Sequence, residues 1–324
     1  MRENPIMVSI VCNTYNHEKY IRDALEGFVN QKTDFNYEIL VYDDASTDNT
    51  AEIIKEYEEK YPELISPVYQ KVNQYSRGLR PSKQNRERAV GKYIALCEGD
   101  DYWIDEYKLQ KQVDYMESHP ECTFCFTNGF VRYGDQLGKQ IVPWDSTSVL
   151  KKDCFDYDAG EVELLNYIPT ASFLFPRSIK YPTISEKAFQ GDTFHKLAMT
   201  SQGYAHFFDE NMCVYRRAVE ESATAVWLKD REKYISFCEA QCQLFKDMDE
   251  VTGGKYADVL KMRICHWEIE KYYTLEDYKT LKKIKVKEIN SGNNYTKYRL
   301  YFKCKFPRIF KYTRVVVNKI KGVR

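Results

Sequence analysis

The sequence has 324 residues, which is enough for two domains or for one large domain with an appendage. Its 48 lysines and arginines balance its 48 aspartates and glutamates, so no overall positive field favours nucleic acid as a partner. No apolar run reaches the ~20 residues of a membrane span, and the N-terminus does not resemble a signal peptide. We therefore expect a globular protein of the cytoplasm.

Ten cysteines are scattered along the chain, and Cys122 and Cys125 form a single CxxC pair. No second pair completes a zinc site, and no redox context flanks the pair. We expect buried, reduced thiols that pack as small hydrophobic side chains.

Strand, polar loop and helix alternate twice in the first sixty residues. Residues 8–12 predict a buried strand that ends at a polar segment, and a helix with apolar residues at helical spacing follows. Residues 37–42 predict a second strand, which ends in the acidic loop 43–48 before a second helix. This alternation predicts a parallel α/β sheet with helices on its faces, in which ligands bind beyond the C-terminal ends of the strands.

Two asparagines are expected to cap these helices. Asn16 is placed to cap the first helix, and Asn49, with Glu52 three residues later, is typical of a capping box before the second.

A third strand is predicted at residues 93–96, and an acidic turn with Glu98, Gly99, Asp100 and Asp101 follows it closely. Carboxylates this close repel one another unless a positive charge lies between them. Hard oxygen ligands of this kind suit Mg²⁺ or Mn²⁺, which commonly take one or two carboxylates together with substrate phosphate oxygens. The alternative is a solvated turn in which an aspartate caps the next helix.

The phosphate-binding loops of common nucleotide enzymes are missing. There is no Gly-x-Gly-x-x-Gly after the first strand and no Gly-Lys-Ser/Thr loop. A phosphate ligand would therefore be met by a metal and by basic side chains. The segment before the acidic turn supplies candidates, although a solvated basic loop explains them equally well: Arg77, Arg80, Lys83, Arg86 and Arg88.

Three phrases, at residues 8–16, 38–48 and 89–101, together resemble the family 2 glycosyltransferases with the GT-A fold. They occur in the family's order and spacing, and the resemblance covers roughly residues 6–130. It implies a mostly parallel sheet flanked by helices, and a nucleotide-sugar donor that is usually a UDP-sugar. It also implies Mn²⁺ or Mg²⁺ as cofactor and inversion at the anomeric carbon.

The resemblance implies a nucleotide site at the first two strand ends. Tyr15 would pack beside the uracil, with Asn13 and Thr14 in the same loop. Asp44, or its neighbour Asp43, would accept the uracil N–H.

The resemblance also assigns the acidic turn. Asp100 would lie near the ribose and Asp101 would bind the metal, with Glu98 standing where the family often has another Asp. The family's usual Arg-Asn pair is not clearly present, so Arg77 is offered as the residue that contacts the diphosphate.

The segment Gln190-Gly191-Asp192 resembles the family's Gly-Glu/Asp-Asp element, whose acid is the catalytic base. An inverting transfer needs one carboxylate within hydrogen-bonding reach of the acceptor hydroxyl. Asp192 is therefore the predicted base, and the alternative is a helix N-cap.

The last hundred residues differ in character. We expect a catalytic domain at 1–225 and a helical extension at 226–324, whose tail, 296–324, is basic and amphipathic. Its basic residues are Lys297, Arg299, Lys303, Lys305, Arg308, Lys311, Arg314, Lys319, Lys321 and Arg324. Such a tail either contacts an anionic inner membrane or packs on the catalytic domain.

These features predict an inverting, metal-dependent glycosyltransferase. It would move a sugar from a nucleotide-sugar donor to a glycan or lipid-linked acceptor in surface polysaccharide biosynthesis. One alternative is a sugar nucleotidyltransferase, which would normally carry the missing glycine-rich loop. Another is a non-catalytic sugar-binding module, which would not need to keep Asp44, Asp100, Asp101 and Asp192.

Overall fold

The computed structural model describes residues 5–141, 155–165, 168–217, 230–286 and 294–311. The chain divides into two compact units, one made of residues 1–181 and 198–221, the other of residues 182–197 and 222–324. The boundary expected at 225/226 lies outside the described residues.

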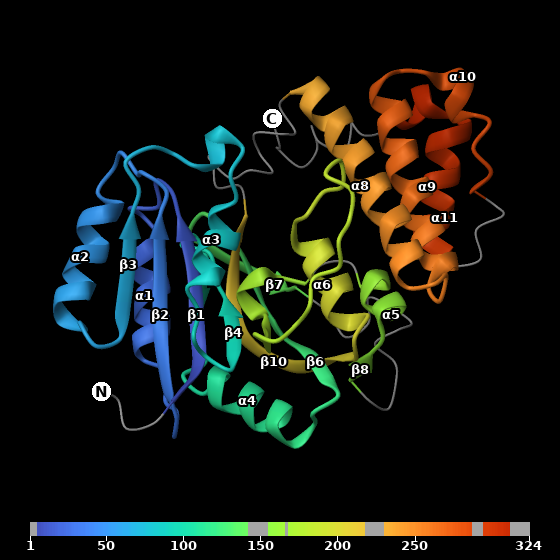
Figure 1. Ribbon diagram of the computed structural model, residues 1–324. Helices are drawn as coiled ribbons and strands as arrows, with labels where there is room; N and C mark the ends of the chain where they lie inside the picture. Colours follow the sequence, from blue (N-terminus) through green and yellow to red (C-terminus); the bar gives the residue numbers. More distant parts are fainter. Residues whose placement is uncertain (1–4, 142–154, 166–167, 218–229, 287–293, 312–324) are drawn as a thin grey trace. The chain divides into compact units, whose positions relative to one another are not determined.

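The first unit contains a ten-stranded sheet (Figure 1). Its strands follow the order β3-β2-β1-β4-β9-β6-β10-β5, with β7 paired to β6 and β8 to β10. Their bounds are β1 Ile6–Thr14, β2 Asn36–Asp43, β3 Ile65–Tyr69, β4 Tyr93–Leu96, β5 Tyr102–Trp103, β6 Cys122–Tyr133, β7 Gln136–Gln140, β8 Asp156–Tyr157, β9 Leu174–Pro176 and β10 Tyr204–Arg217.

Strands β1 to β4 form the parallel half that the sequence predicts. Alternate residues of β1 face opposite sides: Val8 and Ile10 belong to one apolar core and Val11 to the other. Both faces of β1 are therefore buried, as expected for a strand that is apolar on both sides. In the other half β6 and β10 are parallel, whereas β9 runs antiparallel between β4 and β6.

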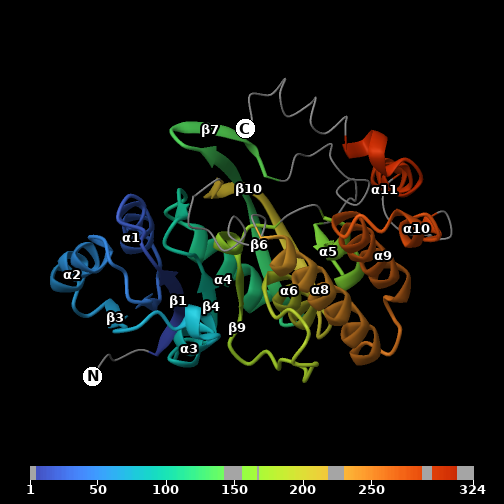
Figure 2. The same ribbon diagram turned by 90° about the horizontal axis from the view of Figure 1, so that it is seen from above.

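Helices cover both faces of this sheet, with α1 on one side and α3 on the other (Figure 2). Apolar residues at helical spacing place one face of α1, α2 and α4 in the apolar core that contains Val8 and Ile10. The helical bounds are α1 Ile21–Val29, α2 Thr50–Lys60, η1 Tyr75–Arg77, α3 Pro81–Glu87, α4 Lys108–Ser118, α5 Ala159–Leu164, η3 Thr170–Ser172 and α6 Asp192–Thr200.

The expected cap at Asn16 is wrong. Tyr20 immediately precedes α1, and Asn16 has a φ of 55° and accepts a 2.8 Å hydrogen bond from the Thr47 N–H through Oδ1. Asn49 does precede α2, but its side chain donates to Glu18 instead of capping the helix. Both asparagines therefore join the first two polar loops to each other.

The second unit is helical, as predicted for this part of the chain. Its helices are α8 Arg231–Val251, α9 Ala257–Thr274, α10 Tyr278–Leu281 and α11 Asn294–Lys305, together with the first residues of α6. A turn with Gly253 and Gly254, both at positive φ, joins α8 to α9. No helix in the described ranges is long and apolar enough to cross a membrane.

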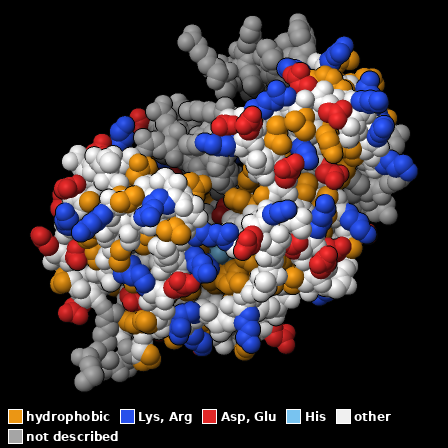
Figure 3. All heavy atoms as spheres, turned by 45° about the horizontal axis from the view of Figure 1, so that its top comes forward, with side chains coloured by type: hydrophobic (Ala, Val, Ile, Leu, Met, Phe, Trp, Pro, Cys, Tyr) orange, Lys and Arg blue, Asp and Glu red, His pale blue; other side chains and the backbone are white. Residues whose placement is uncertain are grey.

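Every cysteine that the structure describes is buried and free of disulfides. The Sγ atoms of Cys122 and Cys125 lie 3.7 Å apart, so this pair is a packing contact. Charges of both signs are interspersed over the face drawn in Figure 3, in keeping with the balanced composition.

Candidate nucleotide-sugar site

Three polar segments meet where β1, β2 and β4 end. The Asp44 N–H donates to the Thr14 carbonyl at 3.0 Å, and the Gly99 N–H donates to the Asn13 carbonyl at 2.9 Å. These bonds extend the parallel pairing past the strand ends, because strands in register deliver their C-terminal residues to the same edge. The sequence-predicted residues of the first unit therefore gather at one edge of the sheet.

Gly99 allows the acidic turn to approach the end of β1. A Cβ atom at this position would lie 2.8 Å from Thr14 Oγ1 and 2.9 Å from Thr14 Cβ, closer than side chains normally come. Glycine, which has no Cβ, therefore lets the turn approach the Thr14 side chain this closely without a shift of either segment.

The last two residues of β1 carry polar atoms with no partner among the described residues. Asn13 Oδ1 and Thr14 Oγ1 are buried and make no hydrogen bond with any described residue, and Asn13 Nδ2 reaches Glu98 Oε1 only at 3.5 Å. A buried polar atom without a partner costs about 1–3 kcal/mol. Next to them Tyr15 is 37% exposed. Such atoms beside an accessible aromatic ring are suited to a bound polar ligand.

The two aspartates at the end of β2, Asp43 as its last residue and Asp44 directly after it, make different contacts. Asp43 Oδ1 accepts bonds from the N–H and the hydroxyl of Ser46; burial raises the pKa of Asp43, and these bonds oppose the rise. Asp44 Oδ1 accepts from the Gln74 N–H at 2.7 Å and Oδ2 from the Tyr75 N–H at 3.0 Å. An ionised carboxylate has about four lone-pair positions, so each oxygen of Asp44 keeps room for another donor.

Arg77 lies in η1, the turn that Asp44 anchors, and its side chain is exposed. Two other basic candidates have structural contacts. Arg86 stacks on the Tyr181 ring at 4.6 Å, and Arg88 donates to the Ser66 carbonyl at 2.7 Å. Of these three, Arg77 is the one on the segment joined to the strand-end edge by Asp44.

The carboxylates of the acidic turn differ in exposure. Glu98 and Asp100 are half-buried, whereas Asp101 is only 2% exposed. Burial raises the pKa of Asp101 well above its usual range, and the nearby Asp100 and Glu98 raise it further. A cation bound beside these carboxylates would relieve their repulsion and favour their ionised forms.

Arg216, near the end of β10, forms hydrogen bonds to this turn through its backbone and its side chain. Its backbone N–H donates to Asp101 Oδ1 at 2.8 Å, and its Nη1 donates to the Asp100 carbonyl at 2.8 Å. Its Nη2 bonds to Asp23 of α1. One arginine therefore ties the last long strand and the first helix to the acidic turn.

Arg216 is 8% exposed, and its guanidinium packs against two aromatic rings. Its Cζ lies 4.5 Å from the centre of the Tyr102 ring and 5.1 Å from that of Tyr20. Arginine is suited to such a position because its planar cation stacks and donates in fixed directions.

The donor chemistry of the turn fits a divalent metal. In the described ranges no three His, Cys, Asp or Glu side chains form a complete protein site. Mg²⁺ and Mn²⁺, however, commonly take one or two carboxylates and complete their shell with phosphate oxygens and water. Glu98 and Asp100 could supply such oxygens. Burial first, then the charges of Glu98, Asp100 and Asp101, raise the pKa of the Cys12 thiol beneath them, which reflects the negative potential at this point.

Asp192 is the first residue of α6, as the sequence predicts. Its side chain is exposed, and the protein around it still raises the pKa of its carboxyl by desolvation, which Lys196 opposes. Solvent access limits the size of this rise. Asp192 belongs to the second unit, so its meeting with the acidic turn stays a prediction.

Sequence reasoning missed two residues that shape the site. Asn85 of α3 is fully buried and donates through Nδ2 to the Cys12 carbonyl at 3.0 Å and the Leu40 carbonyl at 2.9 Å. It thereby fixes β1 to β2 near their ends. Arg216 joins the acidic turn to β10 and α1. No local pattern reveals either contact, because each joins residues far apart in the chain.

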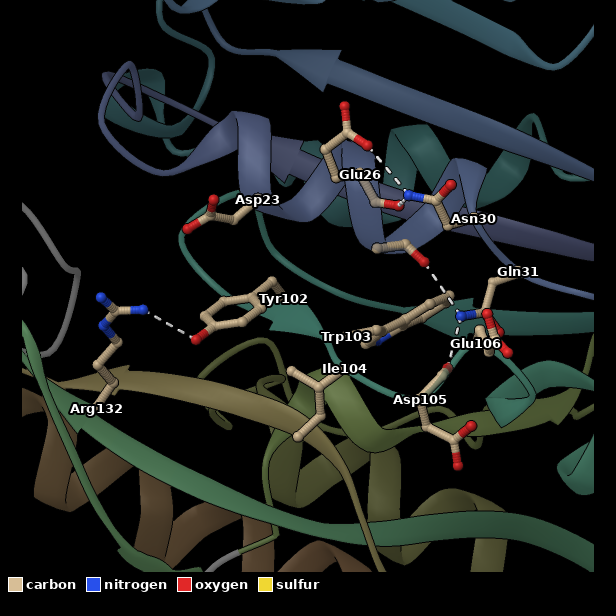
Figure 4. A pocket seen from close by; sticks show the side chains of 11 residues that line it. Asp23, Glu26, Asn30, Gln31, Tyr102, Trp103, Ile104, Asp105, Glu106 and Arg132 are labelled. Atoms are coloured by element: carbon tan, nitrogen blue, oxygen red, sulfur yellow. Dashed lines mark hydrogen bonds between the residues drawn. The ribbon is translucent and has the colours of Figure 1, made fainter.

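A cavity of about 400 Å³ lies between α1 and the segment 102–106 (Figure 4). Several of its polar groups bond to one another: Arg132 Nη1 donates to the Tyr102 hydroxyl at 3.0 Å, and Gln31 Nε2 donates to the Asp105 carbonyl at 2.8 Å. These polar groups of the cavity therefore already have hydrogen-bond partners within the protein.

Comparison with known proteins agrees with this geometry. Residues 9–148 match Glycosyl transferase family 2. An uncharacterized protein of Mycobacterium tuberculosis is 37% identical over 234 residues, which is 70% of this chain and 63% of the relative. The UDP-Glc:alpha-D-GlcNAc-diphosphoundecaprenol beta-1,3-glucosyltransferase WfgD of Escherichia coli is 30% identical over 151 residues, which is 46% of this chain and 56% of WfgD. The chain thus spans less than two thirds of the length of these relatives.

Solved structures share the fold. Staphylococcus aureus TarS 1–349, in complex with UDP-GlcNAc, has a TM-score of 0.61 at 16% identity, covering 92% of this chain and 79% of that one. The mannosyltransferase PcManGT of Pyrobaculum calidifontis, in complex with GDP-Man and Mn²⁺, has a TM-score of 0.52 at 15% identity, covering 86% of this chain and 76% of that one. The chain therefore contains a family 2 glycosyltransferase domain, built on the GT-A fold.

Proposed function

We propose that this protein is an inverting glycosyltransferase that moves a sugar from a UDP-sugar to a hydroxyl of a glycan or lipid-linked acceptor, in surface polysaccharide biosynthesis. The observation that carries the proposal is the strand-end edge, where unpartnered buried oxygens of Asn13 and Thr14 lie in the segment hydrogen-bonded to the acidic turn. The donor and acceptor classes are drawn from the name of WfgD and from the UDP-GlcNAc bound to TarS.

The nucleotide would occupy the loops after β1 and β2. The exposed ring of Tyr15 would pack beside the uracil, and Asn13 and Thr14 would gain the hydrogen-bond partners that they lack. Asp44 is proposed ahead of Asp43 as acceptor for the uracil N–H. Both carboxylates already accept hydrogen bonds, Asp43 from Ser46 and Asp44 from the N–H groups of Gln74 and Tyr75. Asp44 is preferred because its bonds place it beside the turn that carries Arg77, the proposed diphosphate contact.

The exposure of the three acidic side chains of the turn changes which of them we propose as metal ligands. Glu98 and Asp100 are the half-buried carboxylates, and we propose that they face Mn²⁺ or Mg²⁺ and the ribose-diphosphate part of the donor. Asp101, buried and bonded to the Arg216 N–H, would add charge and hold the turn. A bound divalent ion would neutralise negative charge on the departing nucleoside diphosphate.

Asp192 is the proposed base. Its carboxylate would take the proton of the acceptor hydroxyl while that oxygen bonds to the anomeric carbon from the face opposite the diphosphate. The bond from the anomeric carbon to the diphosphate oxygen breaks with its electron pair leaving on UDP. Base assistance of this kind contributes about 10²–10⁴-fold. We place the reaction in the cytoplasm at the inner face of the cell membrane, where a lipid-linked acceptor would be held.

The donor proposal is tested by calorimetry and thermal shift with UDP, UDP-sugars and GDP-mannose, each with and without Mn²⁺. We expect UDP compounds to bind more tightly with the metal and to raise the melting temperature. Replacing Tyr15 with Ala should weaken UDP binding, while Tyr107→Ala, at a tyrosine of similar exposure, should not. Absence of binding by every UDP compound would refute the donor class. Pyrophosphate release from a nucleoside triphosphate would favour a nucleotidyltransferase instead.

The base is tested separately with Asp192→Asn. Transfer should fall by at least about 100-fold, while UDP binding and melting temperature stay near those of the parent. Glu186→Gln, at an exposed acid of the same unit, is the matched control and should keep full activity. Unchanged turnover by Asp192→Asn would refute the assignment.

A further inference from the structure

The outer face of α11 and of the residues after it exposes large apolar side chains. We define this outer face by Tyr298, Phe302, Phe306 and Ile309, which are 72%, 38%, 48% and 53% exposed. They recur three or four residues apart, and hydrogen bonds from the Phe306 N–H to the Phe302 carbonyl and from the Phe310 N–H to the Phe306 carbonyl continue the helical path. Residues at this spacing lie on one side of a helix.

The opposite side of α11 already has its partners. Leu300 and Cys304 are 4% and 0% exposed and belong to an apolar cluster with residues of α9 and α10. Lys303 is also buried and bonds to Glu270 at 2.6 Å. The outer face is therefore not the face that holds the helix in its unit.

Positive charge flanks the outer face. Arg299, Arg308 and Lys311 are exposed, and Lys311 pairs with Glu276 at 2.6 Å. The sequence from residue 289 to residue 324 contains no Asp or Glu. Residues 312–324 of this basic tail lie outside the described residues. A partner that complements aromatic side chains flanked by arginines must present both an apolar surface and negative charge.

We propose that the outer face of α11 binds the surface of an anionic lipid bilayer. Its aromatic rings would enter the headgroup region, where amphipathic rings are favoured, while Arg299 and Arg308 meet lipid phosphates. A second copy of the chain fits less well, because a symmetric pairing of this face would bring the same arginines together. The proposal does not rest on the transferase reaction, since the binding needs neither donor nor acceptor.

The test is co-sedimentation of the full chain with vesicles of phosphatidylcholine alone or mixed with phosphatidylglycerol. We expect binding to the mixed vesicles that weakens with added salt. Arg299→Gln with Arg308→Gln should weaken it roughly 30-fold, since each basic residue near an anionic surface contributes about 1 kcal/mol. Phe302→Ser with Phe306→Ser should weaken it by about tenfold or more.

The matched control is Val251→Ser with Lys255→Gln, an exposed apolar residue at the end of α8 and an exposed basic residue in the turn that follows it, and this variant should bind as the parent does. Melting temperature and UDP affinity report whether each variant is folded. Equal vesicle binding by the parent and both outer-face variants would overturn the proposal. So would absence of binding to anionic vesicles, or a parent dimer that the Phe302→Ser, Phe306→Ser variant dissociates while vesicle binding is unchanged.

Discussion

Replacing Arg216 with Met should both destabilise the protein and loosen the acidic turn. The variant removes the guanidinium that donates to the Asp100 carbonyl and bonds to Asp23. It keeps the backbone N–H that donates to Asp101, because that bond does not involve the side chain. The buried aspartate therefore stays paired while its more exposed neighbour loses its support.

The expected loss follows from these contacts. A carbonyl that loses a charged donor costs about 1–3 kcal/mol. The ion pair with Asp23 adds about 0–1 kcal/mol, because the Asp23 side chain is 50% exposed. The free energy of unfolding should thus fall by about 1–4 kcal/mol. Displacement of Asp100 should raise the Mn²⁺ concentration for half-maximal UDP binding by about tenfold, which corresponds to 1.4 kcal/mol.

The assay is calorimetric UDP binding across a series of Mn²⁺ concentrations, beside urea unfolding in EDTA. Arg216→Lys should recover part of the stability but little of the metal dependence, because an ammonium cannot reproduce the stacked, two-directional donor. Arg217→Met is the control at the adjacent, exposed arginine. If Arg216→Met loses stability while its Mn²⁺ dependence matches that of the parent, the arginine is merely structural and the reasoning fails.

Three further predictions concern the support of the site. Asn85→Leu leaves two strand carbonyls without a donor, so the free energy of unfolding in urea should fall by about 2–4 kcal/mol; an effect no larger than that of the exposed Lys83→Ala would contradict this. Gly99→Ala places a methyl group against Thr14 and should weaken UDP binding by about tenfold in calorimetry, with the fold retained, whereas unchanged affinity would show that the turn can move freely. Burial lowers the pKa of Lys108 to about 8, so below that pH the folded protein carries a charge that burial disfavours. Lys108→Met should therefore gain stability relative to the parent by roughly 3 kcal/mol near pH 7, less the cost of the lost bond to Gln112. The gain should shrink as pH rises from about 8 towards the ordinary lysine value, and a difference that is constant with pH would refute the buried-charge explanation.

Much of the fold could be predicted because its signals are local. The apolar runs that became β1, β2 and β4 end in polar residues, and alternating helices force such strands to be parallel. The same order places Asn13, Asp44 and the acidic turn at one edge without any knowledge of side-chain packing. The two asparagine caps failed because a short polar side chain between loops finds partners that its own sequence neighbourhood does not show.

The sequence by itself determined the family, the parallel half of the sheet and the residues that collect at its C-terminal edge. Only the tertiary structure decided how those residues are used. Asp101 is buried against the backbone of a residue 115 positions away, and Asp44 anchors the turn that carries Arg77. Asn85 bridges two strands that precede it in the chain. Local patterns fix which backbone forms which element, whereas exposure and hydrogen-bond partners depend on what distant segments pack against it, and no local pattern contains that information.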